Sequence, residues 1–252
     1  MPRVSRRRSE TGIYHIMLRG INKQDLFEED EDRGEFLDAL FRYKEDCDVA
    51  LYAYCLMSNH VHLLLKENEQ SVSNLVKRIS SSYVYYYNWK YARTGHLFQE
   101  RFKSEPVESD DYFLTVLRYI HQNPVKANLV DQVEEYEWSS YADYLEKKRI
   151  DYELALGLFG EFSKDPLGEF VRYNHIKNED RCLDYKVRSK KSDKEVREII
   201  KWAGQFDNVN EIQYVDSAKR KEVVGKLKRV TGISMRQIQR ITGLSYRVVR
   251  ES

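Results

Sequence analysis

The chain has 252 residues and a formal net charge of only +1, so it is long enough for one large or two smaller domains, and its total charge does not indicate a nucleic-acid partner. Its three cysteines show no CxxC spacing, which argues against a disulfide framework or a thiolate zinc site and predicts a reduced, cytoplasmic protein. No segment approaches the ~20 apolar residues that a membrane-spanning helix needs.

The first half of the chain alternates between strand and helix patterns. In chain order these are a strand over 12–20, a helix over 32–47, strands over 51–57 and 60–65, a helix over 71–91, a strand over 102–107 and a helix from Ser109 or Asp110 to about Gln122. We expect Asn123-Pro124 to end the last helix, because proline lacks an amide hydrogen. This order predicts an α+β fold, a ferredoxin-like split βαβ antiparallel sheet with helices on one face.

Composition divides the chain into three parts. Residues 1–146 carry the strand and helix patterns, residues 147–191 are polar and indicate a linker with at most short helices, and residues 192–252 are helical. Charge is segregated as well, since residues 219–250 hold ten Lys or Arg against one acid, Glu222. The sequence therefore predicts two domains, the second with a basic surface.

The stretch MSNHVHLLL places His60 and His62 one residue apart in an apolar strand. Residues i and i+2 of a strand point to the same face, so the two imidazoles present adjacent nitrogens. That spacing can chelate one divalent metal, and it is equally compatible with two polar residues on a half-exposed strand. A third ligand would favour the metal.

The stretch RYIHQNPV offers that ligand. Tyr119 and Asn123 are four residues apart on a predicted helix, so they share a face from which His121 points away, and Asn123 carries an amide oxygen. The alternative is that Tyr119 packs in the core and Asn123 only terminates the helix before Pro124.

Together these motifs resemble the single-tyrosine HUH transposases, in particular the REP-associated tyrosine transposases. The resemblance runs from about Gly12 to Leu145, through YHIMLRG, AYCLMSNHVHLLL, GHLFQERFKS, LRYIHQNPVKANLV and WSSYADYL in the family's order. It implies that His60 and His62 bind a divalent metal, Mg²⁺ or Mn²⁺, with Asn123 as a further ligand, and that Tyr119 is the nucleophile.

The resemblance also implies a function. The expected enzyme cleaves and rejoins single-stranded DNA at REP-type hairpins through a covalent 5′-phosphotyrosine, in the bacterial cytoplasm at the nucleoid. Its site could assemble within a monomer or across a homodimer. The alternative is a catalytically silent, domesticated DNA-binding regulator.

Basic and aromatic residues indicate where single-stranded DNA would lie, since backbone charge and base stacking act together in such grooves. The candidates are Arg3, Arg6, Arg7 and Arg8 at the N-terminus, and His96, Phe98, Arg101 and Lys103 in the loop before the fourth strand. Phe98 could equally be packed inside. The tyrosines of residues 83–91 are expected mainly in the helix core.

The C-terminal stretch SMRQIQRITGLSYRVVRES has the layout of a helix-turn-helix, and it is similar to the C-terminal domain of the bacterial replication initiator. Its expected core consists of Ile238, Ile241, Leu244 and Val248. The predicted contacts to double-stranded DNA are Arg236, Arg240, Tyr246, Arg247 and Arg250. A structural or protein-contact role is the alternative, because small trihelical folds share this pattern.

Overall fold

The computed structural model describes residues 6–184, 191–230 and 232–252. The chain divides into a first unit, residues 1–184, and a second unit, residues 185–252, each of which is described by itself. In the described residues no helix is both long and apolar enough to cross a bilayer.

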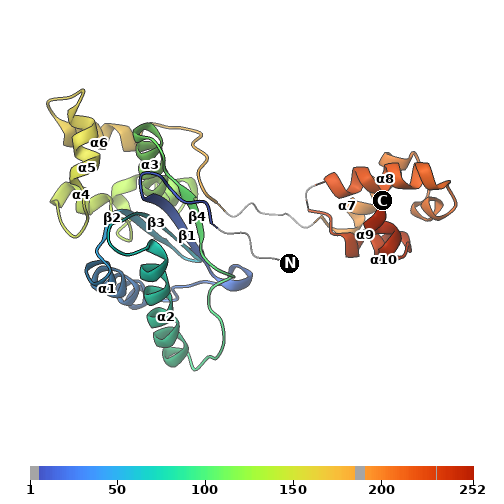
Figure 1. The fold of residues 1–252 in the computed structure, drawn as a ribbon, viewed down its shortest axis with the longest axis horizontal. Coiled ribbons are helices and arrows are strands. Elements are labelled where there is room, and N and C mark those ends of the chain that lie inside the picture. The colour runs from blue at the N-terminus through green and yellow to red at the C-terminus, as the bar shows by residue number, and fades with distance from the viewer. Residues whose placement is uncertain (1–5, 185–190, 231) are drawn as a thin grey trace. The chain divides into compact units, whose positions relative to one another are not determined.

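The first unit is built around a four-stranded antiparallel sheet in the order β2-β3-β1-β4 (Figure 1). Its elements are β1 Ile13–Arg19, η1 Ile21–Lys23, α1 Asp30–Asp46, β2 Val49–Met57, β3 His60–Glu67, α2 Val72–Lys90, β4 Lys103–Pro106, α3 Asp110–Lys126, η2 Val133–Glu135, α4 Tyr141–Glu146, α5 Glu153–Gly160 and α6 Pro166–His175. This order and pairing confirm the predicted α+β class and its split βαβ arrangement.

Helices cover both faces of the sheet. Tyr54 of β2 contacts Phe41 of α1, with ring centroids 5.9 Å apart, and it pairs across the strands with Leu63. His62, the neighbour of Leu63, contacts Tyr119 of α3 at 5.7 Å. Because successive strand residues point to opposite faces, α1 and α3 lie on opposite sides. The helices α1 and α2 pack against each other on one face, and α3 forms a layer on the other. The expectation that helices cover only one face is therefore wrong.

One carboxylate in the first turn of α1, that of Asp32, is fully buried. Asp32 accepts hydrogen bonds from the backbone N–H groups of Glu28 and Glu29, from the phenols of Tyr86 and Tyr91, and from Lys90. Together, these bonds hold the pKa of Asp32 below its ordinary value, although burial alone would raise it. Several tyrosines of α2 therefore join helices rather than forming a stacking surface.

Two sequence expectations about boundaries are wrong. The helix α3 does not stop at Asn123 but continues through Pro124 to Lys126, because a proline in the last turn removes only one helical hydrogen bond near an end that already lacks partners. The segment 147–191 is not a linker over its first part. Phe159 of α5 and Phe170 of α6 are buried in the same core as the sheet, so these short helices belong to the first unit.

The second unit is entirely helical in its described residues, which confirms the expected all-α character. It contains α7 Asp193–Gly204, η3 Val209–Gln213, α8 Ser217–Arg229, α9 Met235–Thr242 and α10 Tyr246–Glu251. Ile238, Ile241 and Leu244 are buried as expected, but Val249 rather than Val248 is fully buried in α10. The helix starts at Tyr246, after its cap Ser245, and that start fixes which valine faces inward.

Candidate active site

The two histidines of β3 lie side by side on the face that α3 covers. Arg19 of β1 pairs with His60, and Met17 pairs with His62. The imidazole centroids of His60 and His62 are 5.0 Å apart. His62 is fully buried, whereas His60 is only partly buried at the end of the strand. The same-face placement follows from the alternation of strand residues, as the sequence indicates.

The hydrogen bonds of His60 define its proton. Its Nδ1 atom lies 2.7 Å from Oδ1 of Asn59, and the same amide donates from Nδ2 to the carbonyl of Lys23 at 3.4 Å. Because an amide oxygen can only accept, Nδ1 of His60 carries the hydrogen and Nε2 keeps its lone pair. A lone pair at Nε2 is what a metal ligand requires.

His62 is held by a third histidine that the sequence reasoning did not single out. Nδ1 of His62 lies 2.9 Å from Nε2 of His15, which is fully buried in the middle of β1. In the described part of the chain, Nε2 of His62 has no hydrogen-bond partner. A buried polar atom without a partner is unusual. Either a ligand binds it, or it lowers the stability of the fold.

All three imidazoles are kept neutral. Burial lowers the pKa of His15 to about 3, and burial followed by the nearby Arg19 guanidinium lowers the pKa of His60 to about 4. Burial, and after it the other two histidines, lowers the pKa of His62 well below its ordinary value. The neutral form is the one that coordinates metals, so the histidine pair is available at neutral pH.

Tyr119 faces these histidines from α3. Its ring centroid is 5.7 Å from that of His62 and 5.9 Å from that of His15, and both contacts are edge-on. The side chain is only 7% exposed. Burial, and after it Asp184 and Cys182, raise the pKa of the phenol above its ordinary value. The residue is therefore a neutral phenol at rest, beside the histidine pair.

Asn123 lies one helical turn beyond Tyr119 and is partly buried. Its Nδ2 atom donates to the carbonyl of Tyr119 at 2.8 Å. This bond orients the amide group. Among the described residues Oδ1 accepts no hydrogen bond, and an amide binds a metal through its oxygen, so Oδ1 is the atom of this side chain that could serve a metal.

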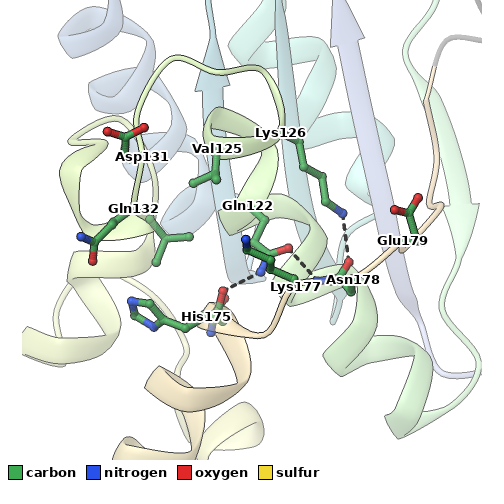
Figure 2. A pocket seen from close by; sticks show the side chains of 11 residues that line it. Gln122, Val125, Lys126, Asp131, Gln132, His175, Lys177, Asn178 and Glu179 are labelled. Atoms are coloured by element: carbon green, nitrogen blue, oxygen red, sulfur yellow. Dashed lines mark hydrogen bonds between the residues drawn. The ribbon is translucent and has the colours of Figure 1, made fainter.

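A network of hydrogen bonds fixes the helix that carries Tyr119. His121 points to the other side, as expected, and its two nitrogens pair with Asn174 at 3.0 Å and Ser140 at 2.8 Å. In the pocket of Figure 2, Gln122 contacts the segment after α6, and Lys126 donates to Oδ1 of Asn178 at 3.1 Å. The Lys126 ammonium also lies 5.2 Å from the centre of the Tyr119 ring. These contacts hold α3 on the sheet and were not visible in the sequence.

The donor set suits a divalent metal that also accepts oxygen ligands. Among the described residues there is no cluster of three or more His, Cys, Asp or Glu arranged for a metal. The available protein donors are Nε2 of His60, the unpartnered Nε2 of His62 and Oδ1 of Asn123. Two imidazoles and one amide fit an ion whose coordination is completed by water or phosphate oxygens. The donor chemistry therefore agrees with the metal implied by the resemblance.

Four of the predicted single-strand contacts line one cavity, and Arg3 lies outside the described residues. Arg6 stacks on Phe102, with its guanidinium carbon 3.5 Å from the ring centre. The candidates lining a cavity of about 640 Å³ are Arg6, Arg7, Arg8 and Arg101.

The remaining candidates differ in their surroundings. Phe98 lines a cavity that shares Arg6 and Arg101 with the first one, and it is half-buried against the core. His96 is exposed and lines neither cavity, whereas Lys103 is partly buried in β4.

In the second unit the predicted DNA contacts all lie on the surface. Arg236 and Arg240 are exposed on α9, and Arg240 pairs with Asp193 through two hydrogen bonds. On α10, Tyr246 is 41% exposed. The remaining two candidates, Arg247 and Arg250, both contact Glu251. The helices α9 and α10 are joined by a short turn at Gly243, whose φ of 72° suits glycine.

A ferredoxin-like sheet with a histidine-hydrophobe-histidine strand, opposed by a helix tyrosine, is the arrangement that the resemblance to single-tyrosine HUH transposases predicts. Residues 9–123 match the sequence family described as "Transposase IS200 like".

Solved structures agree on the fold. A REP-associated tyrosine transposase bound to a REP hairpin aligns with a TM-score of 0.51 and 17% identity, over 58% of this chain and 87% of that one. A candidate transposase from Deinococcus radiodurans aligns over 48% of this chain and 97% of that one at 17% identity, with a TM-score of 0.34 that supports no inference. No curated protein sequence matches the chain.

Proposed function

We propose that the first unit cleaves and rejoins single-stranded DNA at REP-type hairpins, with Tyr119 as the nucleophile and with Mg²⁺ or Mn²⁺ held by His60, His62 and Asn123. The observation that carries the proposal is the position of the Tyr119 ring, 5.7 Å from a buried histidine whose Nε2 has no partner among the described residues. A tyrosine packed only for stability would not require unsatisfied imidazole nitrogens opposite it.

The chemistry follows from these groups. The phenol oxygen of Tyr119 attacks phosphorus, its proton leaves, and the bond from phosphorus to the 3′ oxygen breaks to release a 3′ hydroxyl. A bound divalent metal would polarise the phosphate and offset the charge that builds on its oxygens. Since the phosphotyrosine is itself a phosphodiester, a second 3′ hydroxyl can reverse the step and join new ends without ATP.

The protein's own contribution is mainly placement. The bonds of His121 and Gln122 fix α3, so the phenol stays at one distance from the histidine pair. The buried phenol has a raised pKa, so it attacks only where something compensates its negative charge. A divalent metal held by the neighbouring histidines would supply that compensation, and a phenol far from them would stay unreactive.

The basic surface gives the substrate a path. Arg6, Arg7, Arg8 and Arg101 line one cavity with the ring of Phe102, a combination of charge and aromatic surface that suits single strands. The structurally similar transposase was solved with a REP hairpin, which supports a folded single strand as the substrate class.

The deciding experiment is a search for the covalent intermediate. Wild-type protein is incubated with end-labelled REP-type hairpins and Mn²⁺, and DNA-linked protein is resolved on a denaturing gel. We expect an adduct in wild type, none in Tyr119→Phe, and an adduct retained in Tyr112→Phe, a second tyrosine of the same helix. If the protein binds the hairpin but forms no adduct with Mg²⁺ or Mn²⁺, the proposed enzyme activity is contradicted. The alternative of a silent DNA-binding regulator would then remain.

For the second unit we propose double-stranded DNA binding through α9 and α10. Its support is the exposure of Arg236, Tyr246, Arg247 and Arg250 around a short helix pair. Such a pair can place one helix in the major groove while the arginines of the other contact phosphates.

A further inference from the structure

We infer that His15 is a positioning residue for the metal site: its Nε2 accepts a hydrogen bond from Nδ1–H of His62 and thereby frees Nε2 of His62 as the ligand atom. The inference rests on the proposed function. It deepens that function by assigning a role to a residue that would touch neither the metal nor the DNA.

The position of His15 argues against an incidental polar residue. It lies in the middle of the strand IYHIMLR and is fully buried, where a strand facing a helix ordinarily carries an apolar side chain. Burying an imidazole costs free energy unless its nitrogens are paired, and only one of them is. The bond to His62 is the interaction that offsets part of this cost.

That bond joins two imidazoles, so it contains a single hydrogen. If Nε2 of His15 donates it, Nε2 of His62 must carry a hydrogen and cannot bind a metal. If Nδ1 of His62 donates it, Nε2 of His62 keeps a lone pair and can. Each arrangement leaves one buried N–H and one lone pair unpaired, at Nδ1 of His15 and Nε2 of His62. The arrangement that binds metal satisfies the lone pair, so binding selects it.

In His60 a hydrogen bond also sets the tautomer, but there the tautomer is fixed. Asn59 can only accept at Oδ1, so the ligand tautomer of His60 is set before any metal arrives. For His62 the orienting partner is an imidazole, which can accept or donate. Ligand histidines ordinarily donate their second nitrogen to an orienting group, and loss of such a group costs ~10- to 100-fold in metal affinity or activity.

Two substitutions separate this role from packing. His15→Gln keeps a hydrogen-bond acceptor near the position of Nε2, whereas His15→Leu fills the space without one. Mn²⁺ binding to the full chain is measured by titration calorimetry in a Tyr119→Phe background. We expect His15→Leu to weaken Mn²⁺ binding ~10- to 100-fold and His15→Gln to restore most of it. The control is His175→Gln, which alters a histidine at the end of α6, outside the site, and should leave the affinity unchanged.

The tautomer gives a second readout in the unmodified chain. With ¹⁵N-labelled histidine and Mg²⁺, nitrogen chemical shifts should report a hydrogen on Nδ1 of His62. Unchanged Mn²⁺ affinity in a folded His15→Leu variant, or a hydrogen on Nε2 of His62 at saturating metal, overturns the inference. Should the leucine variant not fold, the nitrogen shifts decide alone. If wild type binds no metal, the proposed function's metal site fails instead, so the two failures are distinguishable.

Discussion

The two units bury different kinds of side chain. Among the described residues, ten buried polar or charged side chains lie in the first unit and one, Thr242, in the second. All six histidines of the chain also belong to the first unit. Polar groups are costly to bury, so their concentration in the first unit agrees with the chemistry proposed for it. The second unit has an apolar core and exposed arginines, which agrees with the DNA binding proposed for it.

Breaking the histidine pair should produce the largest difference between the units. We expect His62→Ala to reduce adduct formation by at least ~10²-fold, because the variant loses a metal ligand that stabilises charge on the phosphate. Binding of duplex DNA by the second unit should not change. Adduct yields are measured on denaturing gels and duplex binding by fluorescence anisotropy. Adducts at the wild-type level in a folded His62→Ala protein would contradict the site.

Acidification should have the next largest effect, because it should lower the stability of the first unit more than that of the second. Unfolded imidazoles take up protons near about pH 6.5. In the folded first unit the pKa values of His15 and His121 lie at about 3 and about 4. Below about pH 6.5 the unfolded state therefore binds more protons, and the stability of the first unit falls until the pH reaches the folded values. The second unit has no histidine and should respond little between about pH 6.5 and about pH 5.5.

Hydrogen exchange resolved by mass spectrometry, at about pH 7 and about pH 5.5 with correction for intrinsic rates, checks this difference. Peptides from β1 and β3 should lose protection on acidification, while peptides from α8 and α9 keep theirs. Equal loss in both units would show that the buried histidines do not control acid stability.

Features that depend on local sequence periodicity were predictable, whereas features that depend on contacts between distant segments were not. The strand His60–Leu65 and the shared face of Tyr119 and Asn123 follow from periods of two and of about 3.6 residues, so both were predictable. His15 was missed because its role depends on the pairing register of β1 with β3, 47 residues away in the chain. The continuation of α3 through Pro124 was missed because a proline in the last turn costs only one helical hydrogen bond, and Gln122 of the same helix donates to a carbonyl of α6 that is 52 residues away in the chain.

A matched pair of arginines tests the second unit, with the smallest expected effect. Arg236 and Arg240 are both exposed on α9, but Asp193 pairs with Arg240, and among the described residues Arg236 makes no ion pair. A guanidinium already compensated by a carboxylate contributes less to phosphate binding than a solvated one. Arg236→Ala should therefore weaken duplex binding about fivefold and lower the salt slope by about 1, and Arg240→Ala should do less. Anisotropy titrations at several salt concentrations measure both quantities. If Arg240→Ala had the larger effect, DNA would have to displace Asp193, and the second unit would rearrange on binding.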